Sequence, residues 1–199
     1  ISAGTERANL LQLPNTVTAR DGFPFYPGYS GAGRVCAIGA GVGDFRIGDR
    51  VVVNWGGHRS HTLKPAKDIL KIEDSAIDLL DAAFAPIAAF SFLGVRKLRL
   101  ELGESAMIAG LGILGMFAVQ AAALSGAIPV LALDFDPVRR ALALKLGAAA
   151  AFSPDEENVR DKIRAATGGG PNAVVEVTGS AAALQQALTA TDAAERDAA

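Results

Sequence analysis

The chain has 199 residues, half of them hydrophobic, which is enough to bury a sizeable core in one large or two small domains. Its formal net charge of −2 argues against nucleic acid or an anionic membrane as a partner. A single cysteine, Cys36, excludes an internal disulfide and a multi-cysteine zinc site. No apolar stretch of about 20 residues lacks charges and turn signals, and the first residues lack a signal-peptide pattern, so we expect a cytoplasmic protein.

The first 75 residues are punctuated by glycine and proline and alternate like β-structure. Strands are predicted over Gly33–Gly39 and Arg50–Trp55, with turns over Gly41–Gly48 and a break at Gly56-Gly57. Short strands separated by frequent turns are typical of a small barrel or sandwich. Cys36 alternates with its neighbours in the first of these strands, so we expect it to be a buried structural thiol.

From about residue 76 the pattern changes to alternating helix and strand, which places a domain boundary between 75 and 76. The predicted elements are a helix over 82–95, strand 106–109, helix 116–125, strand 130–133, helix 137–146, strand 149–152, helix 154–166, strand 173–177 and helix 180–190. Asp136-Pro137 fits an N-cap and a first helical residue, and Ser153–Glu156 fits a capping box. Such alternation predicts a parallel, doubly wound sheet.

The strongest motif is a glycine fingerprint between the strand 106–109 and the helix after it. Its sequence is Gly110-Leu111-Gly112-Ile113-Leu114-Gly115, which fits G-x-G-x-x-G. Gly110 allows a tight turn, Gly112 lets a pyrophosphate approach the backbone, and Gly115 lets the helix pack close to the sheet. The helix N-terminus offers unpaired N–H groups to the phosphates. The residues therefore predict a dinucleotide site.

An acidic residue completes the fingerprint. Asp134 ends the next strand, 19 residues beyond Gly115, where the motif expects an acid that binds the adenosine ribose. Its charge would repel a 2′-phosphate, so the predicted cofactor is NAD; a simple strand-end cap is the other interpretation of Asp134. Arg139 and Arg140 leave NADP open, because a nearby arginine accommodates a 2′-phosphate. Thr178-Gly179 ends the fourth strand of this half, where we expect it to line the cofactor crevice.

These segments together resemble the medium-chain dehydrogenase/reductase superfamily, which contains the zinc-type alcohol dehydrogenases and quinone oxidoreductases. The similar segments, in chain order, are Ser2–Glu6, Gly28–Val35, Phe45–Val51, Gly110–Gly115 and Asn172–Gly179. The resemblance covers nearly the whole chain. It implies a GroES-like β-barrel over residues 1–75 and an α/β Rossmann domain with a doubly wound parallel sheet over 76–199, with the active site between them.

The chain departs from the zinc enzymes at each metal ligand. Ala3 stands where the family has a cysteine, and Tyr29 stands where it has a histidine. The third ligand of the family falls near Pro86, and the four-cysteine structural-zinc lobe is absent. A catalytic zinc needs three protein ligands, and one cysteine and two histidines at these spacings do not supply them. We therefore expect no metal, and a closer resemblance to the zinc-independent branch.

Without zinc, other groups must polarise the carbonyl or transfer the proton. Thr5 occupies the position of the family's proton-relay hydroxyl, and the phenol of Tyr29 would face the cleft, so both are candidate catalytic residues; a turn hydroxyl and a half-buried packing tyrosine are the alternatives. His58 and His61 are spaced to share a site, although surface or packing roles fit them better. Glu6 and its neighbour Arg7 are expected to pair locally, without a catalytic role.

The predicted activity is hydride transfer between NAD, or alternatively NADP, and an alcohol, aldehyde, ketone or quinone. No nucleic-acid or membrane partner is expected. The oligomeric state is left open, with a homodimer as the candidate for the full-length form, because the resemblance places the family's dimer strand after residue 199. Only four strands of the six in a complete dinucleotide fold are predicted. The chain is therefore expected to be a fragment or a truncated product, and the alternative function is a non-catalytic dinucleotide-binding remnant or regulatory module.

Overall fold

The computed structural model describes residues 3–190, which form two compact units divided between Ile87 and Ala88. The predicted boundary at 75 and 76 stays a prediction. The final residues from 191 onward, on which part of the truncation argument rests, lie outside the described range. Among the described helices, none is both long and apolar enough to span a membrane.

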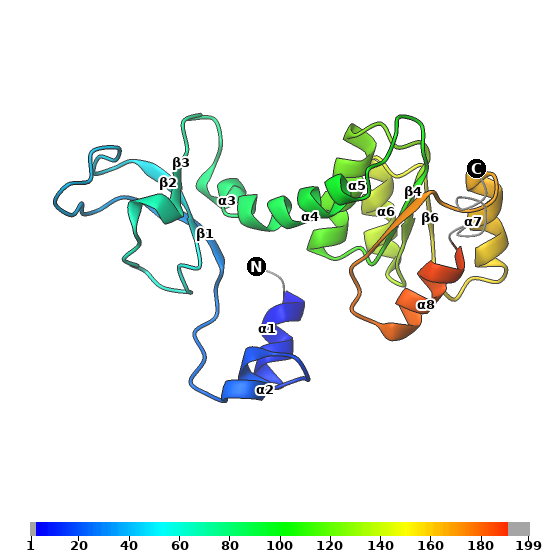
Figure 1. Ribbon diagram of the computed structural model, residues 1–199, viewed down its shortest axis with the longest axis horizontal. Helices are drawn as coiled ribbons and strands as arrows, with labels where there is room; N and C mark the ends of the chain where they lie inside the picture. Colours follow the sequence, from blue (N-terminus) through cyan, green and yellow to red (C-terminus); the bar gives the residue numbers. More distant parts are fainter. Residues whose placement is uncertain (1–2, 191–199) are drawn as a thin grey trace. The chain divides into compact units, whose positions relative to one another are not determined.

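The first unit contains a small antiparallel sheet, in the strand order β1-β2-β3 (Figure 1). Its elements are α1 (Ala3–Leu10), α2 (Val17–Asp21), β1 (Ser30–Arg34), β2 (Arg50–Asn54), the 3-10 helix η1 (Ala66–Asp68), β3 (Ile69–Lys71) and α3 (Leu79–Ala82). Ser30 pairs with Asn54 and Arg34 with Arg50 at the two ends of the β1–β2 ladder. The sheet therefore places the segment before Ser30 directly beside the segment after Asn54.

Two helices at the start of this unit were not predicted. α1 lacks an apolar face, since Asn9 is its only buried residue, so the usual periodic signal is missing. Polar contacts hold the pair together instead. The Asn9 amide donates to the carbonyl of Thr5 at 3.0 Å, and the buried Thr18 hydroxyl donates to the carbonyl of Asn9 at 2.5 Å. Thr16 caps α2 by accepting a bond from the amide of Ala19.

The first predicted strand was misplaced. β1 ends at Arg34, whereas a strand over Gly33–Gly39 was expected. The Val35 amide still donates to the carbonyl of Asp49 at 2.9 Å, but the chain then turns and leaves the sheet. Cys36 consequently lies outside any strand and is exposed, so the expectation of a buried thiol was wrong. The strand expected from Arg50 was correct and ends at Asn54.

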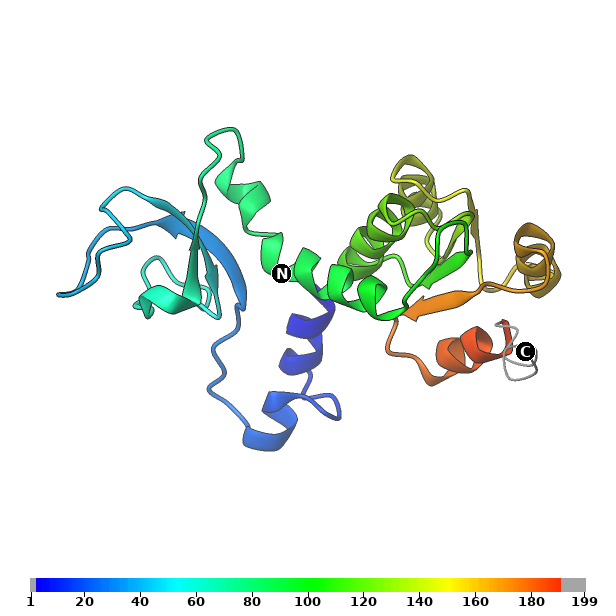
Figure 2. The same ribbon diagram turned by 45° about the horizontal axis from the view of Figure 1, so that its top comes forward.

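The second unit is built on a parallel sheet in the strand order β6-β5-β4-β7. Its elements are α4 (Ala85–Lys97), which starts before the division, β4 (Ala106–Ala109), α5 (Ile113–Leu124), β5 (Val130–Leu133), α6 (Pro137–Lys145), β6 (Ala150–Phe152), α7 (Val159–Thr167), β7 (Ala173–Glu176) and α8 (Ala181–Ala190). Figure 2 shows β7, in orange, at the sheet edge beside β4. The predicted doubly wound parallel sheet is confirmed.

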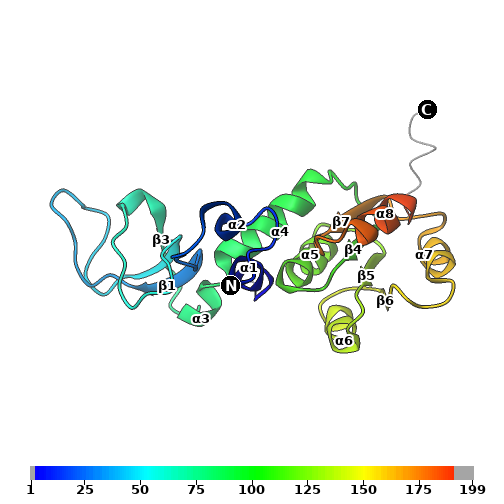
Figure 3. The same cartoon turned by 90° about the horizontal axis from the view of Figure 1, so that it is seen from below.

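Two apolar cores lie on the opposite faces of this sheet, because successive side chains of a strand point to opposite faces. Ala106 and Ile108 of β4 pack in one cluster with α5 and α6, whereas Met107 and Ala109 pack in the other with α7. Figure 3 shows α5 and α6 on one side of the strands and α7 and α8 on the other. β4 and β5 are therefore buried along their whole lengths.

Three helix boundaries differ from the prediction. The helix expected over 82–95 is split into α3, which Asp78 caps, and α4. α5 begins at Ile113, three residues earlier than expected, so Gly115 lies inside it. The predicted capping box forms only in half: the Glu156 carboxylate accepts from the Ser153 amide at 2.7 Å, but the Ser153 hydroxyl bonds to Asp155. The following residues form a turn, and α7 starts only at Val159.

The Glu156 carboxylate generates a test of stability against pH. Its pKa is held below the usual value of 4.5 by the bond from the Ser153 amide and then by the bond from Lys162 at 2.9 Å. A lowered folded-state pKa stabilises the fold at pH values above the unfolded pKa, and this contribution disappears as the pH falls through the folded-state pKa. Glu156→Gln should therefore lower the free energy of unfolding at pH 7, with the deficit shrinking below pH 4.5.

Urea titrations at pH 7 and at about pH 3 measure this difference. The matched control is Glu157→Gln, which changes the exposed neighbouring carboxylate. A deficit of equal size for both variants, or one that does not change with pH, would contradict this account of the turn before α7.

Candidate functional site

The turn between β4 and α5 has a geometry that only glycine allows at its first position. Gly110 has a φ of +91°, and its amide donates to the carbonyl of Leu133 at 2.8 Å. A Cβ at Gly110 would lie 2.7 Å from the Thr178 methyl group. The turn is therefore fixed against both neighbouring strands, β5 and β7.

The other two glycines of the motif have different surroundings. A Cβ on Gly115 would lie 1.8 Å from the carbonyl oxygen of Gly110, so the first turn of α5 packs directly on the glycine turn. A Cβ on Gly112 would meet nothing within 4 Å. Gly112 is also the N-cap of α5, and no side chain caps the helix there. The amides that begin at Ile113 and Leu114 thus sit beside open space, where a helix N-terminus attracts an anion such as phosphate.

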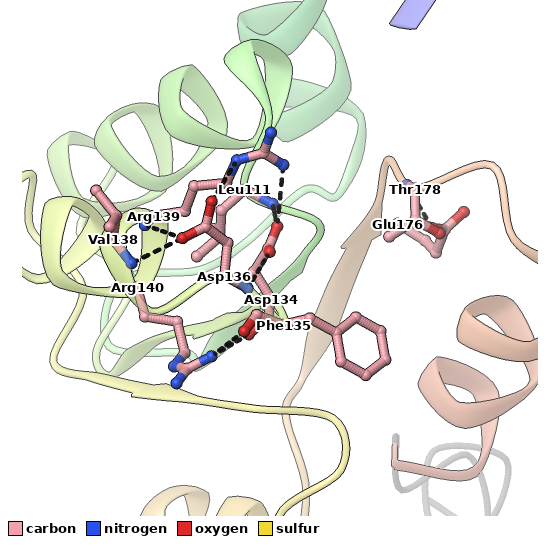
Figure 4. A network of polar contacts seen from close by, with 9 residues as sticks. All are labelled: Leu111, Asp134, Phe135, Asp136, Val138, Arg139, Arg140, Glu176 and Thr178. Carbon is pink, nitrogen blue, oxygen red and sulfur yellow. Dashed lines mark hydrogen bonds and ion pairs between the residues drawn. The ribbon is translucent and has the colours of Figure 1, made fainter.

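Asp134 connects the end of β5 to this turn (Figure 4). One carboxylate oxygen accepts from the Leu111 amide at 2.7 Å, and the other accepts from the Asp136 amide at 2.8 Å. The side chain is 12% exposed. The contacts of a strand-end cap are therefore present, and the same carboxylate lies against the glycine turn. A contact of Asp134 with a ribose stays a prediction.

The two arginines of α6 are placed differently, although both are close to Asp134. The Arg139 guanidinium is half exposed and lies 3.7 Å from the Asp134 carboxylate and 3.6 Å from that of Asp136. Arg140 donates to the backbone carbonyls of Asp134 and Phe135, both at 2.7 Å. Arg139 is thus the cation that faces the acidic group, and Arg140 fixes the loop that carries it (Figure 4).

Thr178 lies at the end of β7, on the other side of the turn. Its amide donates to the Glu176 carboxylate at 2.6 Å, and its hydroxyl bonds to the same oxygen. Gly179 follows with a φ of +70°. Because β5 and β6 lie on one side of β4 and β7 on the other, the strand order reverses between β4 and β7. Open α/β sheets bind ligands at the carboxyl ends of strands at such a reversal, which is where Gly110 meets Thr178.

In the first unit, the candidate hydroxyls occupy two segments. Tyr29 is half-buried, and its ring centroid lies 5.7 Å from that of Trp55 at a tilt of 46°. The Trp55 amide donates to the carbonyl of Tyr29 at 2.9 Å, which extends the pairing beyond β1 and β2. Thr5 is an exposed residue of α1. Catalytic roles for Thr5 and Tyr29 stay predictions.

A contact that the sequence did not predict lies close by. Glu6 was expected to pair with Arg7, but its carboxylate lies 3.4 Å from Nε2 of His58, which is 52 residues further along the chain. His61 has a different partner, since its Nδ1 lies 3.3 Å from the Ser60 hydroxyl. Only the packing of α1 near the loop after β2 brings Glu6 and His58 together, and no sequence spacing signals that packing.

The first unit also contains a cavity of about 490 Å³ over β1 and β2. Arg34, Arg59 and Lys64 contribute to its lining. Across the described residues, no three histidine, cysteine, aspartate or glutamate side chains are grouped so that they could hold a metal ion. The positions where the resemblance places zinc ligands carry alanine, tyrosine and proline.

Two family models match the chain. The model of the alcohol dehydrogenase GroES-like domain matches residues 3–80, and the model described as zinc-binding dehydrogenase matches residues 114–196. The first covers the small sheet with α1 and α2, and the second begins in the first turn of α5. Both predicted fold types, a GroES-like domain and a Rossmann-type parallel sheet, are thereby supported.

Curated relatives and solved structures agree with the models. (R,R)-butanediol dehydrogenase of Bacillus subtilis is 26% identical over 84% of this chain and 56% of its own length, and an alcohol dehydrogenase of Moraxella sp. is 29% identical over 83% and 57%. The crystal structure of 2R,3R-butanediol dehydrogenase from B. subtilis has a TM-score of 0.73 at 26% identity, covering 87% of this chain and 57% of that one.

A protein described as a zinc-binding dehydrogenase, from Sinorhizobium meliloti 1021 and bound to NADP, has a TM-score of 0.78 at 26% identity, covering 95% of this chain and 63% of that one. The chain thus spans a little over half the length of the curated relatives named above. The matched models, relatives and structures show that the chain belongs to the medium-chain dehydrogenase/reductase superfamily.

Proposed function

We propose that the protein is an NAD(P)-dependent oxidoreductase that interconverts an alcohol with an aldehyde or ketone, or reduces a quinone, without zinc. The observation that carries the proposal is the glycine turn, where open space over Gly112 adjoins the uncapped amides of α5 and Asp134 holds the turn from β5. Relatives are named butanediol dehydrogenase, alcohol dehydrogenase and quinone oxidoreductase-like protein, which supports this range of substrates.

The residues of the turn suit a dinucleotide. The cofactor, when bound, supplies the hydride. The amides after Gly112 would hold the pyrophosphate, because they are unpaired and no Cβ blocks the approach. Thr178 and Gly179 would line the nicotinamide side of the crevice, at the reversal of strand order. Asp134 would accept hydrogen bonds from the adenosine ribose.

NAD is the preferred cofactor in this proposal. A carboxylate about 4 Å from a 2′-phosphate costs roughly 1–4 kcal/mol per unit of phosphate charge between the bulk-water and protein-surface limits. Asp134 is mostly buried, so this repulsion is only partly screened. Arg139 acts in the opposite direction, because its half-exposed guanidinium, which now faces the carboxylates of Asp134 and Asp136, would also attract a phosphate. The NADP in the Sinorhizobium structure supports keeping NADP as the second cofactor.

Independence from zinc is supported by the side chains at the metal-ligand positions. Ala3 has no donor atom, Pro86 has none in its side chain, and Tyr29 offers a phenol rather than an imidazole. The polarisation of a carbonyl would then depend on O–H or N–H donors. The Tyr29 phenol and the Thr5 hydroxyl are the candidates that the sequence offers.

The first prediction tests binding at the glycine turn. Gly112→Ala should leave the melting temperature nearly unchanged, because the added methyl meets no protein atom. It should weaken NADH binding at least about tenfold, or about 1.4 kcal/mol, since the methyl would occupy the approach of the pyrophosphate. Nicotinamide fluorescence of the full-length protein measures the affinity.

The matched control for this variant is Gly94→Ala, where a methyl in α4 also meets nothing within 4 Å. Equal NADH affinities of the two variants would refute the placement of the pyrophosphate. If the wild type binds NADH but neither oxidises butanediol with NAD⁺ nor reduces acetoin or benzoquinone with NADH, the result would favour the alternative of a dinucleotide-binding module.

The second prediction concerns cofactor choice. Asp134→Asn removes the charge while keeping a side chain that accepts a bond from the Leu111 amide. The affinity for NADH should fall more than that for NADPH, by about tenfold or more in their ratio. Fluorescence titration with both cofactors measures the ratio, and thermal melting reports any loss of the turn. An unchanged ratio would show that Asp134 acts only as a strand-end cap.

The third prediction concerns metal. The purified full-length protein should contain far less than one zinc per chain by atomic emission, and chelation should leave its turnover unchanged. One bound zinc per chain, with activity lost on chelation and restored by zinc, would overturn the zinc-free part of the proposal.

A further inference from the structure

We propose that the cavity of the first unit binds a small anionic amphiphile, that is, a carboxylate attached to an unbranched apolar chain. The cavity has a volume of about 490 Å³, and all the residues that line it fall between Ser30 and Ile69. Small-molecule sites usually measure about 300–1,000 Å³. The proposal goes beyond the proposed function, because the cavity belongs to the first unit alone and uses no residue of the glycine turn.

The floor of the cavity is one face of the small sheet. It consists of Gly31, Gly33, Val51, Val53 and Ile69. Gly31 lies opposite Val53, which lies opposite Ile69, so these three residues share a face. Gly33 and Val51 are opposite each other two positions along, and therefore belong to the same face. The floor thus offers branched apolar side chains that the hydrocarbon part of a ligand would cover.

The two glycines of β1 leave open space above this floor. A Cβ on Gly33 would meet nothing within 4 Å, and one on Gly31 would meet only the carbonyl oxygen of Val53, at 4.0 Å. Neither glycine has a positive φ. Neither the backbone conformation nor a contact with a described residue therefore requires glycine at these two positions, and the space above them is open to a ligand.

The wall of the cavity is the loop of residues 56–64, which follows β2 and is fixed against the sheet. The Gly57 amide donates to the carbonyl of Gly28 at 2.8 Å. Gly56 approaches Val53 so closely that a Cβ would lie 2.9 Å from a methyl group of that side chain. The start of the wall is therefore already in place before a ligand arrives, which lowers the cost of binding.

The wall carries two cations, Arg59 and Lys64. The Arg59 guanidinium lies 5.1 Å from the centroid of the Tyr26 ring, and Lys64 donates to the carbonyl of Trp55 at 3.3 Å. Within residues 3–190, neither cation forms an ion pair with a carboxylate. None of the residues that line the cavity is aspartate or glutamate. Charge complementarity therefore favours an anion, and both groups are good donors to a carboxylate.

Two other basic residues of the lining are placed less well for this role. Arg34 alternates with Gly33 along β1, so its side chain leaves the sheet on the opposite face, and it donates to the carbonyl of Gly48 at 3.3 Å. Nδ1 of His61 lies 3.3 Å from the Ser60 hydroxyl. The two cations of the wall are therefore the groups that a carboxylate would meet beside the apolar floor.

The test uses octanoate as the probe in the 199-residue chain. Acetate lacks the apolar chain, 1-octanol lacks the charge, and octylammonium has the opposite charge. Isothermal titration calorimetry should give octanoate an affinity at least about tenfold higher than that of each of the other three. The fluorescence of Trp55, the single tryptophan of the chain, provides a second readout, because Trp55 directly precedes the wall.

Labelling of Cys36 locates the bound probe. Cys36 is the only cysteine of the chain, is exposed and lines the cavity, so its reaction with N-ethylmaleimide reports whether the cavity is occupied. Saturating octanoate should slow this reaction at least about threefold, and acetate at the same concentration should leave it unchanged.

Two kinds of variant separate the apolar and the charged parts of the site. Gly33→Leu should abolish octanoate binding, because its side chain would occupy the space above the floor. Its matched control is Gly39→Leu, at a glycine that also meets nothing within 4 Å but does not line the cavity. Arg59→Gln and Lys64→Gln should each weaken octanoate binding at least about fivefold and leave the binding of 1-octanol unchanged. Lys67→Gln, at an exposed cation outside the lining, is their control.

Equal affinities for octanoate and 1-octanol, or octanoate binding that Gly33→Leu leaves intact, would overturn the proposal. If Gly33→Leu does not fold, the charge variants decide. A Cys36 that fails to react without ligand would also overturn it, since another part of the protein would then cover the cavity. Protection that increases with protein concentration would do the same, since the occupant would be a second copy. Binding of NADH enters none of these measurements, so they succeed or fail separately from the proposed function.

Discussion

The hydrogen bond from the Leu111 amide to the Asp134 carboxylate is the constraint on which the second unit depends. It joins the turn after β4 to the residue after β5, at the edge of the sheet where ligands bind in α/β folds. Without a partner, the buried Leu111 amide would cost about 1–3 kcal/mol. The same carboxylate accepts a second bond from Asp136, which is the N-cap of α6. One side chain thus fixes the turn and the start of the next helix together.

A consequence of this arrangement is that residues of the proposed cofactor site also hold the fold together. Gly110 is confined by Thr178, and Gly115 by the carbonyl of Gly110, so two of the three glycines are required by packing alone. Gly112 is different, because nothing in the described structure presses on it. Contacts within the protein therefore do not account for its lack of a side chain, which agrees with the approach of a pyrophosphate proposed above.

The sequence predicted the second unit well and the first unit poorly, for physical reasons that particular residues show. The buried strands that begin at Ala106 and Val130 can be predicted from their continuous apolar runs. Asp136-Pro137 predicts a helix start, because aspartate caps a helix and proline fits its first residue. Such local signals do not need tertiary contacts. The helices α1 and α2 escape them, because the contacts of Asn9 and Thr18 that hold the pair are polar and nine residues apart.

The same limit applies to the candidate sites. The glycine motif and Asp134 could be found from spacing, since their relation is fixed by one strand-helix-strand unit. Tyr29 and Thr5 could be suggested only through resemblance. The contact of Glu6 with His58 could not be found at all, because it joins α1 to a loop 52 residues later. Alternation placed Cys36 in a strand, but the strand ends at Arg34, two residues too early for that pattern to hold.

Because the side chains of β4 are divided between two cores, the register of this strand also fixes the position of the glycine turn. Its four residues alternate between the cluster under α5 and the cluster under α7, and Gly110 follows immediately. A slip of one residue in β4 would turn the side chains of each layer toward the opposite layer. It would also carry Gly110 about 3.3 Å along the strand axis, away from the methyl group and the carboxylate that now enclose the turn. Packing of β4 in the wrong register would therefore also displace the amides at the start of α5, so correct packing of this strand is what aligns them.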